Sequence, residues 1–136
     1  MTDYNDCIVF LLAKAYQRAH ANIKRRLTAY GLTPVQNIVL EALRCEEGLS
    51  AGDLGSKLVL DSATLSGVLD RMSEKGWIVK QTDYEDKRML RIYLSERAKD
   101  LHDELTQERE EANEEILREL SIEESLLLKR LLKDLR

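Results

Sequence analysis

The chain contains little of what stabilises a sandwich, a disulfide-bonded scaffold or a membrane protein. Its 136 residues include one proline, six glycines, two cysteines and 5% aromatic side chains, a composition that favours a mostly helical protein over a turn-rich sandwich or barrel. No apolar run approaches the roughly 18 residues of a transmembrane helix, and acidic residues before the first apolar stretch speak against a signal peptide. Two cysteines cannot form a disulfide framework. We therefore expect a single cytoplasmic domain without a membrane partner.

The net charge of −4 is unevenly distributed along the chain. Residues 1–60 carry 7 basic and 6 acidic side chains, residues 61–100 carry 8 of each, and residues 101–136 carry 6 basic and 11 acidic. The acid excess therefore lies in the C-terminal segment, and the rest of the chain is nearly neutral. Only the local arrangement of charges can indicate a polyanionic partner.

Apolar residues recur at helical spacing through most of the chain. We expect helices over residues 5–29, from Thr33-Pro34 to Gly48, from Ser50 to Leu58, from Asp61 or Ser62 to about Lys75, from Ser95 to about Leu120, and from Ser121 onward. In two of these helices the spacing predicts the buried faces, which are Val35, Ile38, Val39, Ala42 and Leu43, and then Leu65, Val68, Leu69 and Met72. Gly31 is expected to end the first helix in a left-handed conformation.

The pattern changes to a period of two between residues 77 and 94. Residues 77–82 and 89–94 are predicted strands, joined by the polar loop 83–88. Two short helices with a tight turn, followed by a hairpin, predict a mainly α fold with a small β-hairpin wing, a winged helix-turn-helix. The terminal helices carry apolar surface that residues 33–94 are too few to cover, so we expect a second copy of the chain to cover it.

Specific motifs lie in residues 54–99. Segments 54–58 (LGSKL), 64–66 (TLS) and 69–76 (LDRMSEKG) are followed by Asp86-Lys87-Arg88 inside the hairpin and by a strand ending in Leu94-Ser95. On these residues the chain resembles the MarR family of small dimeric bacterial transcription regulators, and the resemblance extends over nearly the whole chain. Many members carry Arg where Gly67 and Lys80 stand here.

The resemblance implies a homodimeric, sequence-specific DNA-binding regulator, most simply a repressor that a small aromatic or anionic ligand releases from a pseudo-palindromic operator on double-stranded DNA. It implies a dimerisation helix in residues 1–32, a DNA-binding domain in residues 33–94 and dimerisation helices in residues 95–136. No cofactor is expected. Because the predicted recognition helix is poor in Arg and amide side chains, we expect modest base specificity, with the wing reading DNA shape.

Within this architecture we expect DNA contacts from two groups of residues, one in the predicted helix-turn-helix and one in the predicted hairpin. Arg88 suits a narrow, A·T-rich minor groove, with Asp86 holding its side chain extended. The full predicted set is Ser50, Ser62, Ala63, Thr64, Ser66, Arg71, Lys80, Asp86, Lys87, Arg88 and Arg91. The alternatives are that Ser62 and Thr64 only cap the helix and that the wing charges form a solvated ion pair.

An effector site is a further candidate on the first helix. Lys14 and Arg18 lie four residues apart, beside Tyr16 and His20, and a cationic pair near an aromatic ring suits a carboxylate ligand. The alternative is that this basic helix faces solvent or pairs with the acidic helix that follows Ser95. The acidic pairs at 110–111 and 114–115 are most simply a solvated helix face.

The remaining reactive residues suggest little chemistry. Cys7 and Cys45 are candidates for a thiol-based redox-sensing repressor of the same fold, but cysteines in apolar helices are usually inert. His20 and His102 do not combine with them at any metal-binding spacing, so we expect no metal site. No nucleophile, phosphate-loop or paired-carboxylate motif indicates an enzyme. A helical protein-interaction module that has lost DNA binding is the other alternative.

Overall fold

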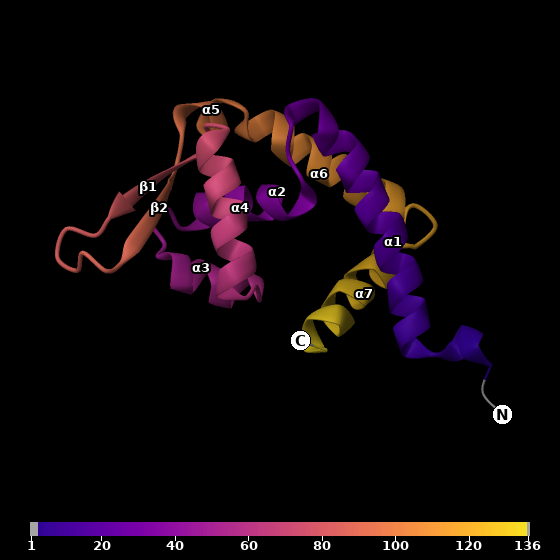
Figure 1. Ribbon diagram of the computed structural model, residues 1–136. Helices are drawn as coiled ribbons and strands as arrows, with labels where there is room; N and C mark the ends of the chain where they lie inside the picture. Colours follow the sequence, from indigo (N-terminus) through magenta and orange to yellow (C-terminus); the bar gives the residue numbers. More distant parts are fainter. Residues whose placement is uncertain (1–2, 136) are drawn as a thin grey trace.

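The computed structural model describes residues 3–135 as seven α-helices and one antiparallel hairpin (Figure 1). The helices are α1 (Ile8–Leu27), α2 (Pro34–Cys45), α3 (Ala51–Leu58), α4 (Ser62–Glu74), α5 (Glu96–Asp100), α6 (His102–Leu117) and α7 (Ile122–Asp134), and the strands are β1 (Ile78–Thr82) and β2 (Leu90–Leu94). Single 3₁₀ turns, Tyr4–Asp6 and Thr28–Tyr30, flank α1. The winged helix-turn-helix predicted from the sequence is confirmed. No helix in this described range is long and apolar enough to cross a membrane.

Side-chain caps explain where most of the helices begin. Thr33, Ser50, Asp61, Ser95 and Ser121 each accept the backbone N–H of the residue three positions later, at 2.8–3.2 Å. Such bonds satisfy N–H groups that have no partner within the helix. Four of these caps lie where the sequence predicts them, and Asp61 is one of the two residues predicted to begin α4. Gly31 takes the predicted left-handed conformation after α1, with φ of 70°.

One hydrophobic core joins the winged unit to its flanking helices. It contains Trp77, Leu43, Leu54, Met72 and Ile92 from α2 through the hairpin, and all five are fully buried. The same cluster takes in side chains from α1, α5 and α6, namely Leu27, Ala98 and Leu105. The winged unit is therefore packed directly on the helices before and after it.

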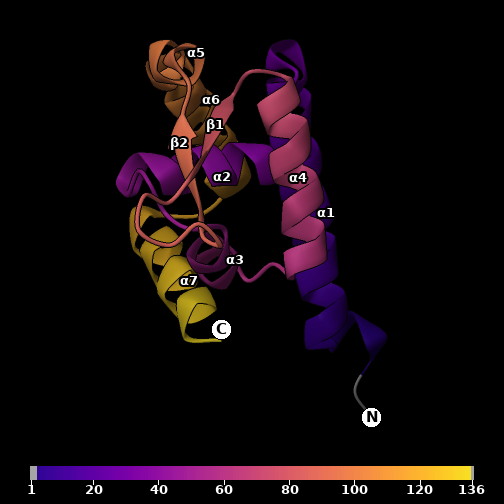
Figure 2. The same ribbon diagram turned by 60° about the vertical axis from the view of Figure 1, so that its left-hand side comes forward.

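The hairpin is tied to the segment before α3. Ile78 pairs with Leu94 and Thr82 with Leu90 in the β1–β2 register. A third short segment joins β2, because Gly48 N–H donates to Ile92 C=O and Ile92 N–H donates to Leu49 C=O, both at 3.0 Å. Figure 2 shows the hairpin standing beside α4, with α3 below it, close to β2.

Two of the predicted helices differ from the structure in their bounds or buried face. The helix expected from Ser95 to Leu120 is two helices, because Leu101 leaves the helical conformation (φ −92°, ψ 5°), and α6 ends at Leu117. In α2 the helix ends at Cys45, before Gly48, and Ile38 is 52% exposed while Leu40 is buried. The buried face of α2 is rotated, since Gln36 and Asn37 occupy positions on the core side.

Two glycines in the helix-turn-helix predict opposite effects on stability. A Cβ added at Gly55 would lie 3.2 Å from the backbone oxygen of Leu60 and 3.3 Å from the buried side chain of Leu65, whereas at Gly67 it would meet only the flexible end of Arg71, at 3.4 Å. Gly67→Ala should raise the free energy of unfolding by about 0.8–1.0 kcal/mol through helix propensity. Gly55→Ala should lower the free energy of unfolding by about 1 kcal/mol, because the cost of overpacking exceeds the gain in helix propensity. Urea denaturation of both variants measures the difference, and equal effects would contradict the close packing at Gly55.

Candidate nucleic-acid interface

Helix α4 presents a polar face beside the hairpin. Leu65, Val68, Leu69 and Met72 are all buried, as predicted. The opposite side therefore exposes the predicted contact residues Ser62, Ala63, Thr64, Ser66 and Arg71. The predicted recognition helix thus presents mainly hydroxyl groups, with one cation in its last turn.

The N-terminus of α4 is held by Asp61. Its carboxylate accepts the backbone N–H and the hydroxyl of Thr64, both at 2.8 Å, and the bond from the Thr64 backbone is the main reason that the pKa of Asp61 lies below its usual value. The Thr64 hydroxyl is therefore engaged in capping α4, which is the alternative role that the sequence left open for Thr64. Ser62 takes no part in that cap.

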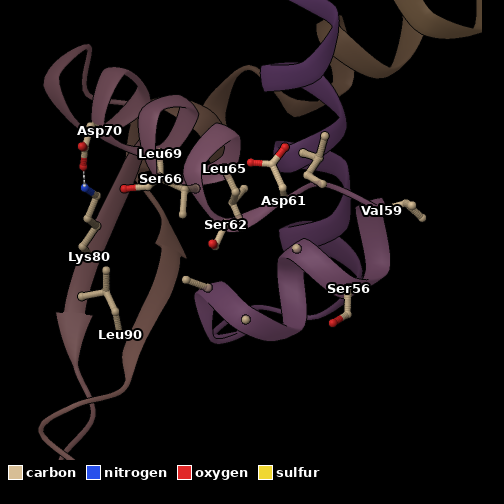
Figure 3. A pocket seen from close by; sticks show the side chains of 14 residues that line it. Ser56, Val59, Asp61, Ser62, Leu65, Ser66, Leu69, Asp70, Lys80 and Leu90 are labelled. Atoms are coloured by element: carbon tan, nitrogen blue, oxygen red, sulfur yellow. Dashed lines mark hydrogen bonds and ion pairs between the residues drawn. The ribbon is translucent and has the colours of Figure 1, made fainter.

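A groove separates α3 and α4 from the base of the wing (Figure 3). Ser62 and Ser66 line it from α4, Leu90 lines it from β2, and across it the ammonium of Lys80 pairs with the carboxylate of Asp70. Lys80, predicted to contact phosphate, thus has an acidic partner in the free protein. For a phosphate to take the place of Asp70, the Lys80 ammonium must first release the Asp70 carboxylate.

Arg71 lies back along α4 toward Gly67. The space left by the missing side chain of Gly67 is bordered by the Arg71 guanidinium. Many members of the resembled family carry Arg at the Gly67 position, and here an arginine from the next helical turn brings a guanidinium beside that site. The sequence indicates the missing side chain at Gly67, whereas this placement of Arg71 is evident only in the fold.

The wing tip carries a cation that is almost fully exposed to solvent. The Arg88 side chain is 92% exposed, and the Asp86 carboxylate accepts its backbone N–H at 3.0 Å and its Nε–H at 3.3 Å. Lys87 is exposed between them. The contact that the sequence predicted between Asp86 and Arg88 is therefore present, and the outer edge of the guanidinium stays free.

Arg91 is held by Asp83, an acidic residue outside the predicted set of contact residues. Its Nε–H donates to Asp83 at 2.6 Å and its Nη1 donates to the Gly48 carbonyl at 2.9 Å. This one hydrogen bond is the main reason that the pKa of Arg91 is raised and the pKa of Asp83 is lowered. Tyr84, the neighbour of Asp83 in the loop, is 97% exposed and was also missed. An aspartate opening a polar hairpin loop was the available signal for Asp83.

Ser50 occupies a different environment from the other predicted contact residues. It is 8% exposed, and its hydroxyl accepts the Asp53 N–H at 3.1 Å. The structure thus gives it a capping task at the start of α3.

The candidate effector residues do not converge on one face of α1. Residues two apart on an α-helix point about 200° apart, so Lys14 and Arg18 lie nearly opposite Tyr16 and His20. The rings of Tyr16 and His20 lie together, with centroids 5.3 Å apart, while the Lys14 ammonium lies over Phe10 at 5.8 Å. A site that uses all four residues needs surfaces beyond one chain.

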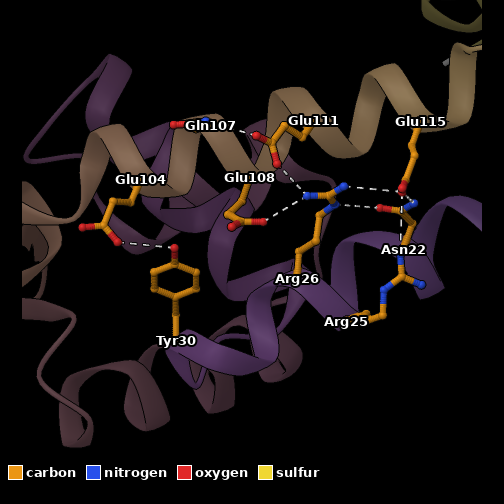
Figure 4. Close-up of polar contacts among 9 residues, drawn as sticks. All are labelled: Asn22, Arg25, Arg26, Tyr30, Glu104, Gln107, Glu108, Glu111 and Glu115. Carbon is orange, nitrogen blue, oxygen red and sulfur yellow. Dashed lines mark hydrogen bonds and ion pairs between the residues drawn. The ribbon is translucent and has the colours of Figure 1, made fainter.

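The last turns of α1 pair with α6, which confirms the ion-pairing alternative for this end of the helix (Figure 4). Arg26, whose side chain is 20% exposed, donates to Glu111 at 2.8 Å and to Glu108 at 3.3 Å, and lies 3.5 Å from Glu115. Burial alone would lower the pKa of Arg26, but these carboxylates raise it. The expectation that the 110–111 and 114–115 pairs are only a solvated face is therefore wrong for Glu111 and Glu115.

The same network predicts how stability depends on pH. A hydrogen bond from Asn22, followed by the charge of Arg26, holds the pKa of Glu115 below its ordinary value of 4.5. A lowered carboxyl pKa stabilises the fold above the unfolded value and is lost as pH falls through the folded value. Glu115→Gln should therefore flatten the fall in unfolding free energy below about pH 4.5, measured by urea denaturation from pH 3 to 7. The exposed neighbour Glu114→Gln is the control, and an equal flattening there would contradict the assignment.

Large apolar side chains remain exposed on both terminal helices. Helix α7 buries no residue, and the apolar side chains on it and at its C-cap are 38–70% exposed, namely Leu127, Leu128, Leu131, Leu132 and Leu135. Ile8, Val9 and Leu11, in the first turns of α1, are 47–71% exposed. A 13-residue helix without a packing partner is marginal in water, so these surfaces need a covering partner.

Comparison with known proteins agrees with this geometry. A model of the MarR family matches residues 32–90, from the residue before the Thr33 cap to the start of β2. The HTH-type transcriptional regulator SarZ of Staphylococcus epidermidis is 38% identical over 80 residues, which is 59% of this chain and 54% of SarZ. The chain thus spans about half the length of that curated relative.

Two solved structures match almost the whole chain. A probable transcriptional regulator from Pseudomonas aeruginosa is 31% identical, with a TM-score of 0.92 over 98% of this chain and 100% of that one. Bordetella bronchiseptica BpsR, whose DNA binding is regulated by 6-hydroxynicotinic acid, is 25% identical, with a TM-score of 0.92 over 99% of this chain and 96% of BpsR. The structural match therefore includes the terminal helices in addition to the winged unit.

Proposed function

The chain belongs to the MarR family, and we propose that it acts as a homodimeric repressor that binds a pseudo-palindromic operator in double-stranded DNA. Residues 33–94 read the DNA, and the helices in residues 1–32 and 95–136 build the dimer. The observation that carries the proposal is the wing: Arg88 is 92% exposed at the tip of a hairpin that contacts α4, whose outer face is polar.

The proposed contacts divide between the two elements. Helix α4 enters the major groove through its N-terminal half, where Ser62, Ala63 and Ser66 meet base edges or phosphates. Arg88 enters the neighbouring minor groove, and Lys87 contacts phosphate. Because hydroxyls discriminate weakly among bases, the wing supplies much of the sequence preference by reading groove width.

The exposed apolar surfaces support the proposal that a second copy of the chain binds the first. The leucines of α7 and the first turns of α1 offer a face that an isologous partner would bury. In such a dimer the two α4 helices meet half-sites about one helical turn apart on the DNA. The repressor would work beside chromosomal DNA, in the cytoplasm, by occupying a promoter.

A small anionic aromatic molecule is the proposed effector. BpsR, which shares this fold at 25% identity, responds to 6-hydroxynicotinic acid. On this chain Lys14 and Arg18 offer charge for a carboxylate and Tyr16 with His20 offers an aromatic wall, and the dimer is needed to bring the opposite faces of two α1 helices into one site. The ligand would favour a dimer in which the distance between the two α4 helices no longer fits DNA.

A salt titration tests the DNA-binding proposal. We expect fluorescence anisotropy with a duplex from upstream of the protein's own gene to show saturable binding. The logarithm of affinity should fall against the logarithm of salt concentration with a slope of about −3 or steeper, since each neutralised phosphate contributes about 0.9. Absent binding, or a flat response, would favour the interaction module without DNA binding.

A thiol-switched repressor is the second candidate, because both Cys7 and Cys45 are exposed to solvent. Peroxide should then weaken DNA binding by the wild-type chain. It should leave unchanged the DNA binding of a variant in which both cysteines are replaced by serine. Equal binding by both proteins under peroxide would eliminate this candidate.

A further inference from the structure

An ion pair in the wing connects the start of the wing loop and β2 to a segment that is distant in the sequence. The Arg91 guanidinium on β2 bridges Asp83, at the start of the wing loop, and the Gly48 carbonyl, before α3. We call this contact among Gly48, Asp83 and Arg91 the wing clip. We propose that Asp83 and Arg91 are positioning residues for DNA binding, which hold the wing loop so that Arg88 points at the DNA. This inference rests on the proposed function.

The Asp83 carboxylate orders the loop on its other side. While Oδ1 accepts from Arg91, Oδ2 accepts the backbone N–H of Asp86 at 2.9 Å and of Glu85 at 3.1 Å. This is the turn in which an aspartate caps the residues that follow it. Asp86 in turn accepts both the backbone N–H and the Nε–H of Arg88. A continuous series of hydrogen bonds therefore runs from Arg91 to Arg88.

Side-chain exposure increases along this series. Asp83 is 18% exposed and Arg91 37%, whereas Asp86 is 43% and Arg88 92% exposed. The inner pair is thus partly shielded from solvent and salt, while the outer pair is open to a ligand. An arrangement fixed at its base and free at its tip reduces the entropy that Arg88 loses on binding.

Gly48 provides a firm anchor for the clip. It has φ of +84°, its N–H is bonded to Ile92, and a Cβ at this position would lie 3.2 Å from the ring of Tyr93. Glycine is therefore required both by the left-handed conformation and by the close approach of the ring. Two residues later Ser50 caps α3, so the clip fixes the wing relative to the helix-turn-helix.

The clip and a direct phosphate contact by Arg91 predict opposite results for Asp83. If Arg91 served only as a phosphate-binding charge, removing the neighbouring acid would leave DNA binding equal or tighter, because the interface gains positive charge. If the clip positions Arg88, Asp83→Asn weakens DNA binding even though it removes a negative charge from the interface. The sign of this one effect separates the two roles.

The experiment measures DNA affinity by anisotropy for Asp83→Asn, Arg91→Gln and the double variant, each in the wild-type and Arg88→Ala backgrounds. We expect each single variant to lose affinity about threefold to tenfold, the double variant to lose no more than either, and the losses to fall below about twofold in the Arg88→Ala background, since coupled residues are non-additive. Arg91→Lys should recover only part of the loss, because Lys lacks the fork that bridges two acceptors. Glu96→Gln, an exposed acid on α5, is the charge-matched control and should bind as the wild type does. Binding by Asp83→Asn as tight as wild type, or an undiminished loss in the Arg88→Ala background, would overturn the inference.

Amide hydrogen exchange tests the clip without DNA. In Asp83→Asn and Arg91→Gln the N–H groups of Glu85 and Asp86 should exchange faster than in the wild type, while those of α4 keep their rates. Unchanged exchange at both loop amides would refute the ordering role. If the wild-type chain binds no duplex, the proposed function fails and the positioning role fails with it, but faster exchange would still establish that the clip orders the loop.

Discussion

Replacing Arg88 with alanine is expected to weaken operator binding by about tenfold to a hundredfold, the range typical for losing one specific arginine contact. The side chain is 92% exposed in the free protein and its guanidinium is aligned by Asp86. The variant therefore loses a prepositioned cation at little cost to folding. Anisotropy titrations at several salt concentrations measure the loss, and the slope against salt should become shallower by about 0.9 for each phosphate contact removed.

Two variants in the same loop are the controls for Arg88→Ala. Arg88→Lys keeps the charge but not the planar fork, so it should restore only part of the affinity in a narrow minor groove. Lys87→Ala should weaken binding to all sequences equally and by a smaller factor. An Arg88→Ala protein that binds its operator as tightly as wild type would remove the wing from the DNA interface.

A glutamate in the apolar face of α7 is expected to produce a monomer that has lost operator binding. Leu131 lies at the centre of the face formed by Leu127, Leu128, Leu132 and Leu135, and it is 45% exposed in the single chain. Burying a leucine side chain contributes about 1.5–3 kcal/mol to the stability of an interface. In an isologous interface each substitution is present twice, once in each chain. Leu131→Glu should therefore shift the chain to monomers at micromolar concentration and reduce operator affinity by about a hundredfold or more, since only one half-site can be held at a time.

Lys133→Glu is the matched control for this variant. Residues two apart on a helix project about 200° apart, so Lys133 places its charge on the side of α7 away from Leu131. This variant should stay dimeric and bind DNA. Sedimentation velocity gives the mass, and far-UV circular dichroism checks that both variants keep their helices. A dimeric Leu131→Glu protein would show that α7 lies outside the interface.

Local signals in the sequence predict the helix-turn-helix well. Asp61 is a strong cap because its short carboxylate reaches the N–H of Thr64, and the spacing of Leu65, Val68, Leu69 and Met72 defines one buried face. Both features depend only on residues within a few positions of each other. Helical period and capping chemistry therefore suffice to place this element.

Features that depend on distant residues were missed or misplaced. The break at Leu101 carries neither glycine nor proline, so nothing local indicates it. The shift of the α2 face from Ile38 to Leu40 follows from packing against other elements. Asp83 meets Arg91 across the hairpin, and Arg26 meets Glu111 across 85 residues. Single-sequence periodicity contains no information on such pairings, which only the folded chain brings together.

The most direct test of the central claim is sedimentation velocity on the wild-type chain at micromolar concentration, alone and with a duplex bearing an inverted repeat from upstream of its gene. We expect a species of twice the 15.7 kDa chain mass and a complex with two chains on each duplex. A folded single chain, or one chain on each duplex, would contradict the claim that paired winged units bind the DNA.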